Sequence, residues 1–486
     1  MNPIDYGNLF AITLPETILE VVSLLVLVLD LGWLRKSSQT KRMGAANLVG
    51  VFGCALAIVW LLAHPQASSF AGGALVATPL VAAAQIGILV LTALVLLLSV
   101  HAEFSRNPGE YVAIILLGTT GMLLVTAARD LLVIFVALEL LSLSLYVLTA
   151  FAKSSSQSAE AALKYYLFGG MSAALMLFGF SYLYGLTGTT GLTGIAAALA
   201  AQSVSPLLVV ALVLVAAGLG FKVAAAPFHL WAPDTYQGAP TPVAALIASG
   251  SKVASFAVLI ALTGGVIAPQ SYAQSSTWVV LLVWMAAGSI VLGNLAALVQ
   301  SSVRRLLAYS AIAHAGYMLL GIAAHTAQSG AAVLYYALTY ALTTIGVFGV
   351  IAVVERSAGS DRLDAFAGLS RRNPLLAASM LIYLLSLAGI PPLVGFWAKF
   401  NLFAAVLRSP GAVHWGLPLV AMALAASAVS LFYYLQVLKR VYVVKPVQTK
   451  PLRVSFVELA TLAAIALAVA LLGILPGALN GWIPLG

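Results

Sequence analysis

The stretch GLGFKVAAAPFHLWAPDTY, residues 218–236, places Lys222 inside a long apolar run and follows it with Pro227. A second stretch, SLAGIPPLVGFWAKF at 386–400, has two consecutive prolines before Lys399. Proline removes a backbone donor and breaks a helix, and broken backbone at membrane depth is tolerated only where protein or water satisfies it. We therefore predict two interrupted membrane-spanning helices, each beside a buried cation.

The composition favours an all-α integral membrane protein. Of the 486 residues, 62% are hydrophobic and only 8% are charged, whereas soluble proteins carry about 25% charged residues. The mean hydropathy is +1.06. The net charge of +9 could indicate a nucleic-acid partner, but the basic residues lie mostly between apolar runs. We therefore expect the lipid bilayer as a partner, and no nucleic acid.

The sequence lacks the motifs of several enzyme classes. Cys54 is the only cysteine, so the chain alone cannot build an iron–sulfur cluster or a thiolate zinc site. No two histidines have H-x-x-x-H spacing, and there is no G-x-x-x-x-G-K-[ST] loop and no G-x-G-x-x-G after a strand pattern. We expect no metal and no cofactor in this chain, and energy that comes from an ion gradient or a partner.

A helix needs about 20 apolar residues to cross the hydrocarbon core, and this length predicts fourteen spans with short loops. The expected spans lie near 9–33, 44–63, 78–100, 111–128, 131–151, 162–186, 206–228, 241–267, 277–299, 306–325, 330–354, 374–400, 417–438 and 456–480. No segment is long or polar enough to form a separate soluble domain.

Basic residues predict the orientation of these spans. Seventeen of the 23 lysines and arginines lie in loops that follow odd-numbered spans, and only Arg129 and Arg408 lie in loops that follow even-numbered spans. Cytoplasmic loops carry the excess of basic residues. The loops after odd-numbered spans are therefore expected in the cytoplasm, and both termini on the non-cytoplasmic side.

Four ionisable residues lie well inside expected spans and need an explanation: Glu139, Lys222, Lys252 and Lys399. Four acidic residues also fall within the first and last spans, but towards their ends, where a misplaced boundary is the default explanation: Glu16, Glu20, Asp30 and Glu458. A charged side chain at mid-membrane costs at least about 2.5–3.5 kcal/mol. Burial disfavours the ammonium form of lysine and a nearby carboxylate favours it. A lysine whose acidic partner moves can therefore load and release a proton. Glu139 and Lys222 are the preferred pair, although the sequence does not show that they touch.

Three further residues are weaker candidates for proton transfer. Lys164 lies only a few residues into the sixth expected span, where snorkelling explains it equally well. His229 lies seven residues after Lys222, but Pro227 intervenes. His314 lies within the tenth span and could relay a proton, because the unperturbed pKa of histidine is about 6.5. A hydrogen-bonded core histidine is an equal alternative.

The two interrupted helices also predict an internal repeat. Spans four to eight and nine to thirteen form two sets of five, and the interrupted span is the fourth in each. An odd number of spans per set inverts one set relative to the other. We therefore expect one membrane domain, residues 1–486. Its parts would be three N-terminal helices (1–110), two inverted repeats (111–267 and 277–443) and a C-terminal helix (456–486).

Several segments resemble the antiporter-like membrane subunits of respiratory complex I, the proton-translocating NADH:quinone oxidoreductase. The resemblance covers essentially the whole chain, and YQGAPTPV is similar to the subunit N branch of that family. The segments that carry it are ALELLSLSLYVL at 137–148, ALKYYLFGGMSAALMLFG at 162–179, FKVAAAPFHLWAPDTYQGAPTPVAAL at 221–246, RLLAYSAIAHAGYML at 305–319 and LSLAGIPPLVGFWAKFNLF at 385–403.

The resemblance implies roles by position. Glu139 matches the fifth-span glutamate, Lys222 the seventh-span lysine, Lys252 the central eighth-span lysine and Lys399 the twelfth-span lysine near the exit. Lys164 and His314 match positions of a central polar axis.

The resemblance also implies that the whole complex is a translocase of the cell inner membrane. It would use NADH, FMN, iron–sulfur clusters and quinone, all held by other subunits. The expected partners are other membrane subunits, with quinone reached through the complex.

Two other functions remain open at this point. A subunit of a multisubunit Na⁺/H⁺ antiporter would retain the same lysines, and so would a related membrane hydrogenase or photosynthetic-type complex with a donor other than NADH. A purely structural membrane scaffold would not explain the buried lysines.

Overall fold

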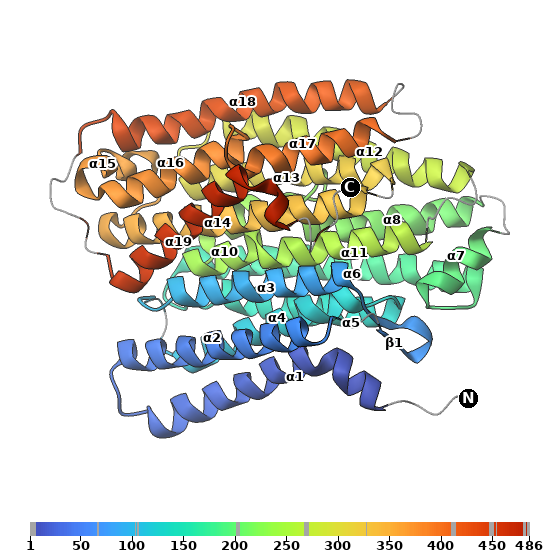
Figure 1. Ribbon diagram of the computed structural model, residues 1–486, viewed down its shortest axis with the longest axis horizontal. Helices are drawn as coiled ribbons and strands as arrows, with labels where there is room; N and C mark the ends of the chain where they lie inside the picture. Colours follow the sequence, from blue (N-terminus) through green and yellow to red (C-terminus); the bar gives the residue numbers. More distant parts are fainter. Residues whose placement is uncertain are drawn as a thin grey trace.

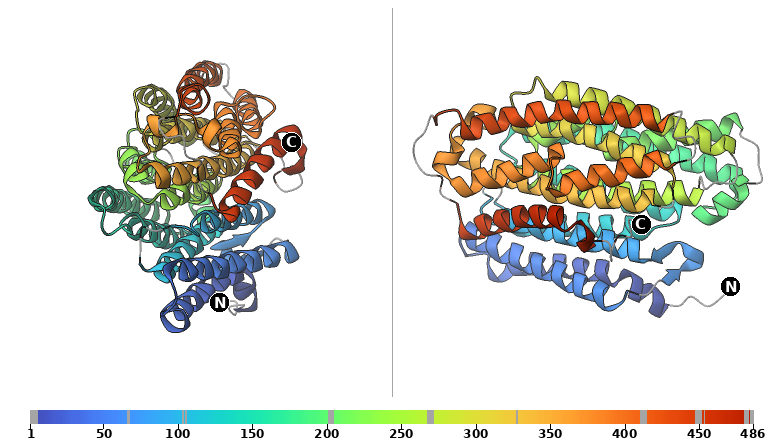
Figure 2. Two further views of the ribbon diagram at one scale, coloured as in Figure 1. Left: turned by 90° about the vertical axis from the view of Figure 1, so that its left-hand side faces the viewer. Right: turned by 45° about the horizontal axis from the view of Figure 1, so that its top comes forward.

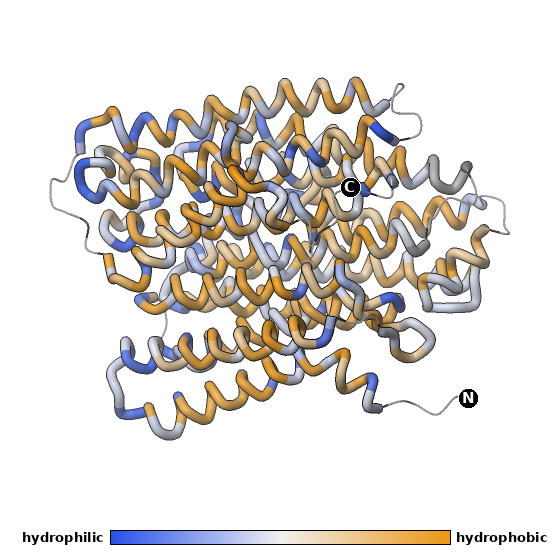
Figure 3. Tube along the Cα trace, viewed as in Figure 1, coloured by the Kyte–Doolittle hydropathy of each residue, from blue (hydrophilic) through white to orange (hydrophobic). Residues whose placement is uncertain are grey.

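The computed structural model is a bundle of helices that lie side by side, roughly parallel or antiparallel (Figure 1). It describes residues 6–65, 68–102, 104, 106–200, 205–266, 272–326, 328–409, 415–446, 452, 454–479 and 483. Seen from the end, the helices pack in several layers, with α1 at one edge (Figure 2). Hydrophobic residues fill the middles of the helices, and hydrophilic residues gather towards their ends (Figure 3).

The prediction of fourteen spans is confirmed, because thirteen described helices are long and apolar enough to cross a membrane and a broken helix completes the set. The chain is therefore a multi-pass membrane protein. The spanning helices are α1 (Tyr6–Val28, extended by the π-helical turn Leu29–Trp33), α2 (Gln39–Ala63), α3 (Pro79–Leu98), α4 (Pro108–Ala127), α5 (Leu131–Thr149), α6 (Ser156–Thr187), α8 (Pro206–Val223), α10 (Thr241–Ala248) with α11 (Gly250–Val266), α12 (Tyr272–Ala297), α13 (Val303–Ala324), α14 (Ser329–Ala358), α16 (Pro374–Ala388) with α17 (Val394–Leu407), α18 (Gly416–Tyr442) and α19 (Phe456–Ile474).

Short elements connect the spans, and the sequence analysis did not predict them. The strands β1 (Ser68–Phe70) and β2 (Leu75–Ala77) form an antiparallel hairpin between α2 and α3. The remaining short elements are the helices α7 (Leu192–Ala200), α9 (Trp231–Gly238) and α15 (Leu369–Arg372), with 3₁₀ turns at Ala71–Gly73, Leu363–Phe366 and Pro476–Leu479.

Both predicted interruptions are present. The seventh span ends at Val223 rather than at 228, because Ala224 adopts a left-handed conformation with φ of 57°. In the twelfth span, helix α16 ends before Gly389, which has a φ of 87°, and the span continues as helix α17. Residue Ser249 makes a third break, between α10 and α11, which the sequence analysis did not predict because no proline marks it.

Matched backbone contacts at opposite ends of the bundle support two inverted sets of five spans. Before α5, Leu131 N donates to Thr190 O and Leu192 N donates to Arg129 O, each at 2.9 Å. Before α13, Val303 N donates to Asp361 O and Leu363 N donates to Ser301 O at the same 2.9 Å. The first pair of hydrogen bonds lies near α7 and the second pair near α15, and Figure 1 shows these two helices at opposite ends of the bundle. The domain boundaries themselves stay a prediction.

Glycines let the first two helices of each set approach closely, as small residues do in membrane bundles. A Cβ on Gly121 in α4 would lie 2.7 Å from the backbone nitrogen of Leu141 in α5. A Cβ on Gly293 in α12 would lie 2.6 Å from the backbone nitrogen of Ala313 in α13. Since backbone atoms cannot turn aside, any side chain at these positions separates the helices.

We expect Gly293→Val to lower the stability of the protein, because overpacking costs about 1–3 kcal/mol. The measurement is the melting temperature (Tm) of the purified protein in detergent. Gly170→Val in α6 is the matched control, since nothing lies within 4 Å of a Cβ there. Equal Tm values for the two variants would contradict this account of the α12–α13 contact.

Candidate functional site

The predicted pair of Glu139 and Lys222 is in contact. Lys222 lies in the last turn of α8, directly before the break, and its Nζ is 3.4 Å from Oε1 of Glu139 in α5. The same Nζ is 2.5 Å from the Oγ of Ser142, one helical turn after Glu139. The last turn of a helix favours a cation, because its free carbonyl groups carry partial negative charge. The lysine is thus held by a carboxylate, a hydroxyl and a helix terminus.

The two members of this pair differ in burial. The Lys222 side chain is 6% exposed and the Glu139 side chain is 24% exposed. The carboxylate therefore reaches the surface of the isolated chain while the ammonium group does not. A charge outside this chain can act on Glu139 directly and on Lys222 through it.

Lys252 is the most isolated of the buried lysines. It lies in the first turn of α11, after the break at Ser249, and its Nζ donates to the carbonyl of Ala311 in α13 at 2.6 Å. The Nζ also lies 5.3 Å from the ring centroid of Tyr340 in α14. Within the described part of the chain no carboxylate lies within 4.0 Å of this amine. A carbonyl and an aromatic face therefore take the place of an ion-pair partner.

His314 lies at the centre of a cluster of tyrosines. Its Nδ1 is 2.7 Å from the hydroxyl of Tyr336, and its Nε2 is 3.4 Å from the hydroxyl of Tyr434. The ring centroids of His314 and Tyr340 are 4.8 Å apart. Because Tyr340 also faces Lys252, this ring connects the lysine of α11 with the histidine of α13.

Lys399 lies on the far side of the twelfth-span break. Its Nζ donates to the carbonyl of Ala388 at the end of α16, at 2.8 Å, and to the hydroxyl of Ser427 in α18, at 2.7 Å. A small cavity of about 10 Å³ is lined by both His314 and Lys399. That volume is close to what one water molecule needs, so a single water could bridge the two side chains.

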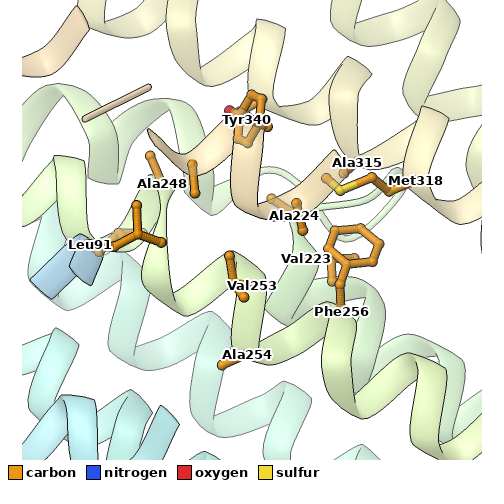
Figure 4. Packing of buried hydrophobic residues seen from close by; sticks show 14 of the residues in the cluster. Leu91, Val223, Ala224, Ala248, Val253, Ala254, Phe256, Ala315, Met318 and Tyr340 are labelled. Carbon is orange, nitrogen blue, oxygen red and sulfur yellow. The ribbon is translucent and has the colours of Figure 1, made fainter. Parts of the chain in front are cut away.

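The contacts divide the candidates into two groups. Glu139, Ser142 and Lys222 form the first group. Lys252, Tyr340, His314 and Lys399 form the second. Val223 directly follows Lys222 and Val253 directly follows Lys252, and both are buried in the apolar core that Figure 4 shows in part. A proton therefore needs water or side-chain movement to pass from the first group to the second.

Two of the three weaker candidates, Lys164 and His229, lie outside these groups, whereas His314 belongs to the second. Lys164 is 40% exposed and pairs with Glu160 at 2.7 Å and Asp234 at 2.9 Å. Asp234 also binds Arg305 at 2.6 Å, so this network ties α6, α9 and α13 together. His229 is buried in the break between α8 and α9, and its Nδ1 has no partner among the described residues. A part for either residue in proton transfer stays a prediction.

Sequence reasoning missed the polar residues that accompany the charges. Ser142 could have been found from its spacing of one helical turn from Glu139. Tyr340 and Ser427 gave no such signal, because they reach the lysines from other helices. The described residues contain no group of three His, Cys, Asp or Glu side chains placed to hold a metal ion.

We expect Lys252→Met to leave the Tm of the purified protein unchanged or higher. Replacing a buried charge that lacks an ionic partner with an apolar chain of similar size removes a desolvation cost. Arg304→Met is the control, because Arg304 is buried and pairs with Glu355 at 2.9 Å. That variant should lower the Tm. A comparable fall in both variants would contradict the isolation of Lys252.

Known proteins are similar in sequence to nearly the whole of this chain. The transmembrane family described as NADH:quinone oxidoreductase/Mrp antiporter matches residues 128–427. NADH-quinone oxidoreductase subunit N 2 of Acidobacterium capsulatum is 48% identical over 99% of this chain and 100% of that protein. Subunit N of the same enzyme from Desulfovibrio desulfuricans is 40% identical over 96% of this chain and 95% of that protein.

Solved structures share the fold. A chain of respiratory complex I from Thermus thermophilus with bound aureothin superposes with a TM-score of 0.80 at 35% identity, over 97% of this chain and 100% of that one. A chain of an archaeal membrane-bound sulfane sulfur reductase gives 0.83 at 26% identity, over 99% and 96%. A chain of the Mrp complex from Dietzia gives 0.83 at 21% identity, over 98% and 96%, which shows the fold alone.

Proposed function

This chain belongs to the membrane-subunit family shared by NADH:quinone oxidoreductases and Mrp antiporters, and we propose that it is the proton-translocating subunit N of a bacterial NADH:quinone oxidoreductase. Relatives named as that subunit are up to 48% identical over the full length. The contact between Glu139 and Lys222 beside a broken helix supports proton translocation, and the similarity to relatives named subunit N supports the assignment to the oxidoreductase. Ionisable residues within membrane spans are costly and therefore usually mark a functional site.

The pair acts as the coupling element of the pump. While Glu139 stays charged and close, it favours the ammonium form of Lys222. When a charge change in a neighbouring subunit draws Glu139 away or neutralises it, the buried lysine loses that support and releases its proton. The partial exposure of Glu139 gives the neighbouring subunit access to it.

The second group of residues carries the proton onward. Lys252 accepts it, and the cluster of Tyr340 and His314 leads towards Lys399, with a water molecule in the small cavity as the last bridge. A positive charge that arrives at Lys252 repels the proton already on Lys399, because few counter-charges screen them at that depth. Each arriving proton thereby expels one ahead of it.

Energy for these steps comes from outside the chain. Flavin, iron–sulfur clusters and the quinone site belong to other subunits of the complex, and NADH is oxidised there. The subunit lies in the cell inner membrane, with its basic loops in the cytoplasm and both termini on the other side. These placements follow the distribution of lysine and arginine along the chain.

A subunit of an Na⁺/H⁺ antiporter is the second candidate, since the Mrp complex shares this fold. It would use the same lysines without any redox reaction. Residues alone do not separate the two functions, so the separating measurement has to follow electron transfer and ion movement together.

We expect Lys222→Ala to reduce NADH-driven quinone reduction and proton uptake together, by about tenfold or more. The measurement uses membrane vesicles from the source organism, with the variant at its native locus and assembly checked on a native gel. Glu160→Gln is the control, because this carboxylate is 64% exposed and its ion pair with Lys164 lies at the surface. Intact redox activity with loss of sodium-dependent proton exchange would assign the chain to an antiporter.

A further inference from the structure

The first helix carries a carboxylate in an unusual place. Helix α1 with its π-helical extension spans Tyr6–Trp33, and both end residues are exposed aromatics, Tyr6 at 70% and Trp33 at 81%. Exposed tyrosine and tryptophan mark the two membrane–water interfaces. At 1.5 Å per residue, Glu20 lies about 20 Å from each end. It therefore lies at the middle of the bilayer, and not towards the end of the first span as expected from the sequence.

Glu20 faces outward. Helix α1 packs against α2 and α4 and lies at the edge of the bundle in both views (Figures 1 and 2). Glu20 is exposed, and on the same outer face Val21, Leu24 and Val28 are 57%, 63% and 66% exposed. Among charged residues in the middle of the described spans, Glu20 is the only one that is exposed.

No group in the described part of the chain compensates this carboxylate. The Glu20 side chain has no hydrogen bond or ion pair there. The hydroxyl of Ser23 donates to the backbone carbonyl of Glu20 at 2.7 Å, which leaves the carboxylate unbound. The surrounding apolar residues suit lipid tails, but lipid tails cannot donate a hydrogen bond. The outer face of α1 is therefore incomplete in the isolated chain.

A second carboxyl lies one turn before Glu20 on the buried side of α1. Glu16, one turn before Glu20, is buried at 3% exposure. Its Oε1 accepts a hydrogen bond from Gln85 in α3 at 3.2 Å, and its Oε2 has no partner among the described residues. Neither Glu16 nor Glu20 has a cationic partner within 4.0 Å among the described residues.

We propose that the outer face of α1 binds a transmembrane helix of another membrane subunit, and that this helix places a lysine, arginine or histidine side chain against Glu20. Charge complementarity selects this occupant. In a two-fold contact between copies of this chain, residues at the same depth meet. Glu20 would then face Glu20. That the partner is an oxidoreductase subunit rests on the proposed function. That the partner carries a basic group rests on the exposed Glu20 alone.

The test is made on the complex in its native membrane. A photo-reactive benzoylphenylalanine at Leu24, one turn from Glu20 on the same face, is activated and the product is digested and sequenced by mass spectrometry. We expect a cross-link to a transmembrane helix of another subunit, within about one turn of a basic residue. Cross-links only to lipid, to a second copy of this chain, or to a helix without a nearby basic residue would overturn the proposal.

Variants at Glu20 give an independent readout. Glu20→Leu and Glu20→Gln each leave the partner's basic group without its counter-charge. We expect both to decrease the amount of cross-linked subunit that co-purifies in mild detergent by about tenfold, with the level of this chain in the membrane unchanged on an immunoblot. Val21→Leu, on the same face, is the control and should retain the partner. Equal retention in all three variants would overturn the proposal.

These measurements do not depend on proton pumping. If the chain served an antiporter instead, the cross-link would still form, with a subunit of that assembly. Failure of the proposed function would therefore leave the interface intact, and failure of the interface would leave the vesicle measurements unaffected.

Discussion

The rest of the structure depends on one constraint: an amine in the membrane interior must find polar partners that the hydrocarbon cannot supply. Each of the three buried lysines meets it beside a break in a helix. Lys222 precedes the break after α8, Lys252 follows the break before α11, and Lys399 binds the carbonyl of Ala388 where α16 ends. Of the three, Lys399 uses a carbonyl that a break leaves free. Lys222 binds side chains of α5, and Lys252 binds the carbonyl of Ala311 within the continuous helix α13.

The partners of the three lysines let each amine carry a proton without binding that charge tightly. Lys222 has one carboxylate at 3.4 Å, which is longer than a tight ion pair, and a hydroxyl at 2.5 Å. Lys252 and Lys399 have neutral partners only, within the described residues. Neutral partners accept a hydrogen bond from an ammonium group without binding it as a counter-ion does. Such sites can exchange protons at a modest energetic cost.

The sequence was sufficient for the features that leave a local mark. Pro227 and the two prolines before Lys399 predicted two breaks, and the apolar run lengths predicted the fourteen spans. The break at Ser249 was missed, because serine is compatible with a helix and only tertiary packing bends the chain there. Tyr340, Tyr434 and Ser427 were missed for a related reason. They approach the lysines and the histidine from other helices, and spacing along the chain does not encode such contacts.

The central claim is that Glu139 and Lys222 act as a single unit in proton transfer. A double-mutant cycle tests it most directly, with initial rates of NADH-driven proton uptake measured in vesicles that carry Glu139→Gln, Lys222→Ala or both changes. If the two residues act as one unit, the double variant is no slower than the slower single variant. If the two losses multiply, the residues act independently and the account is contradicted.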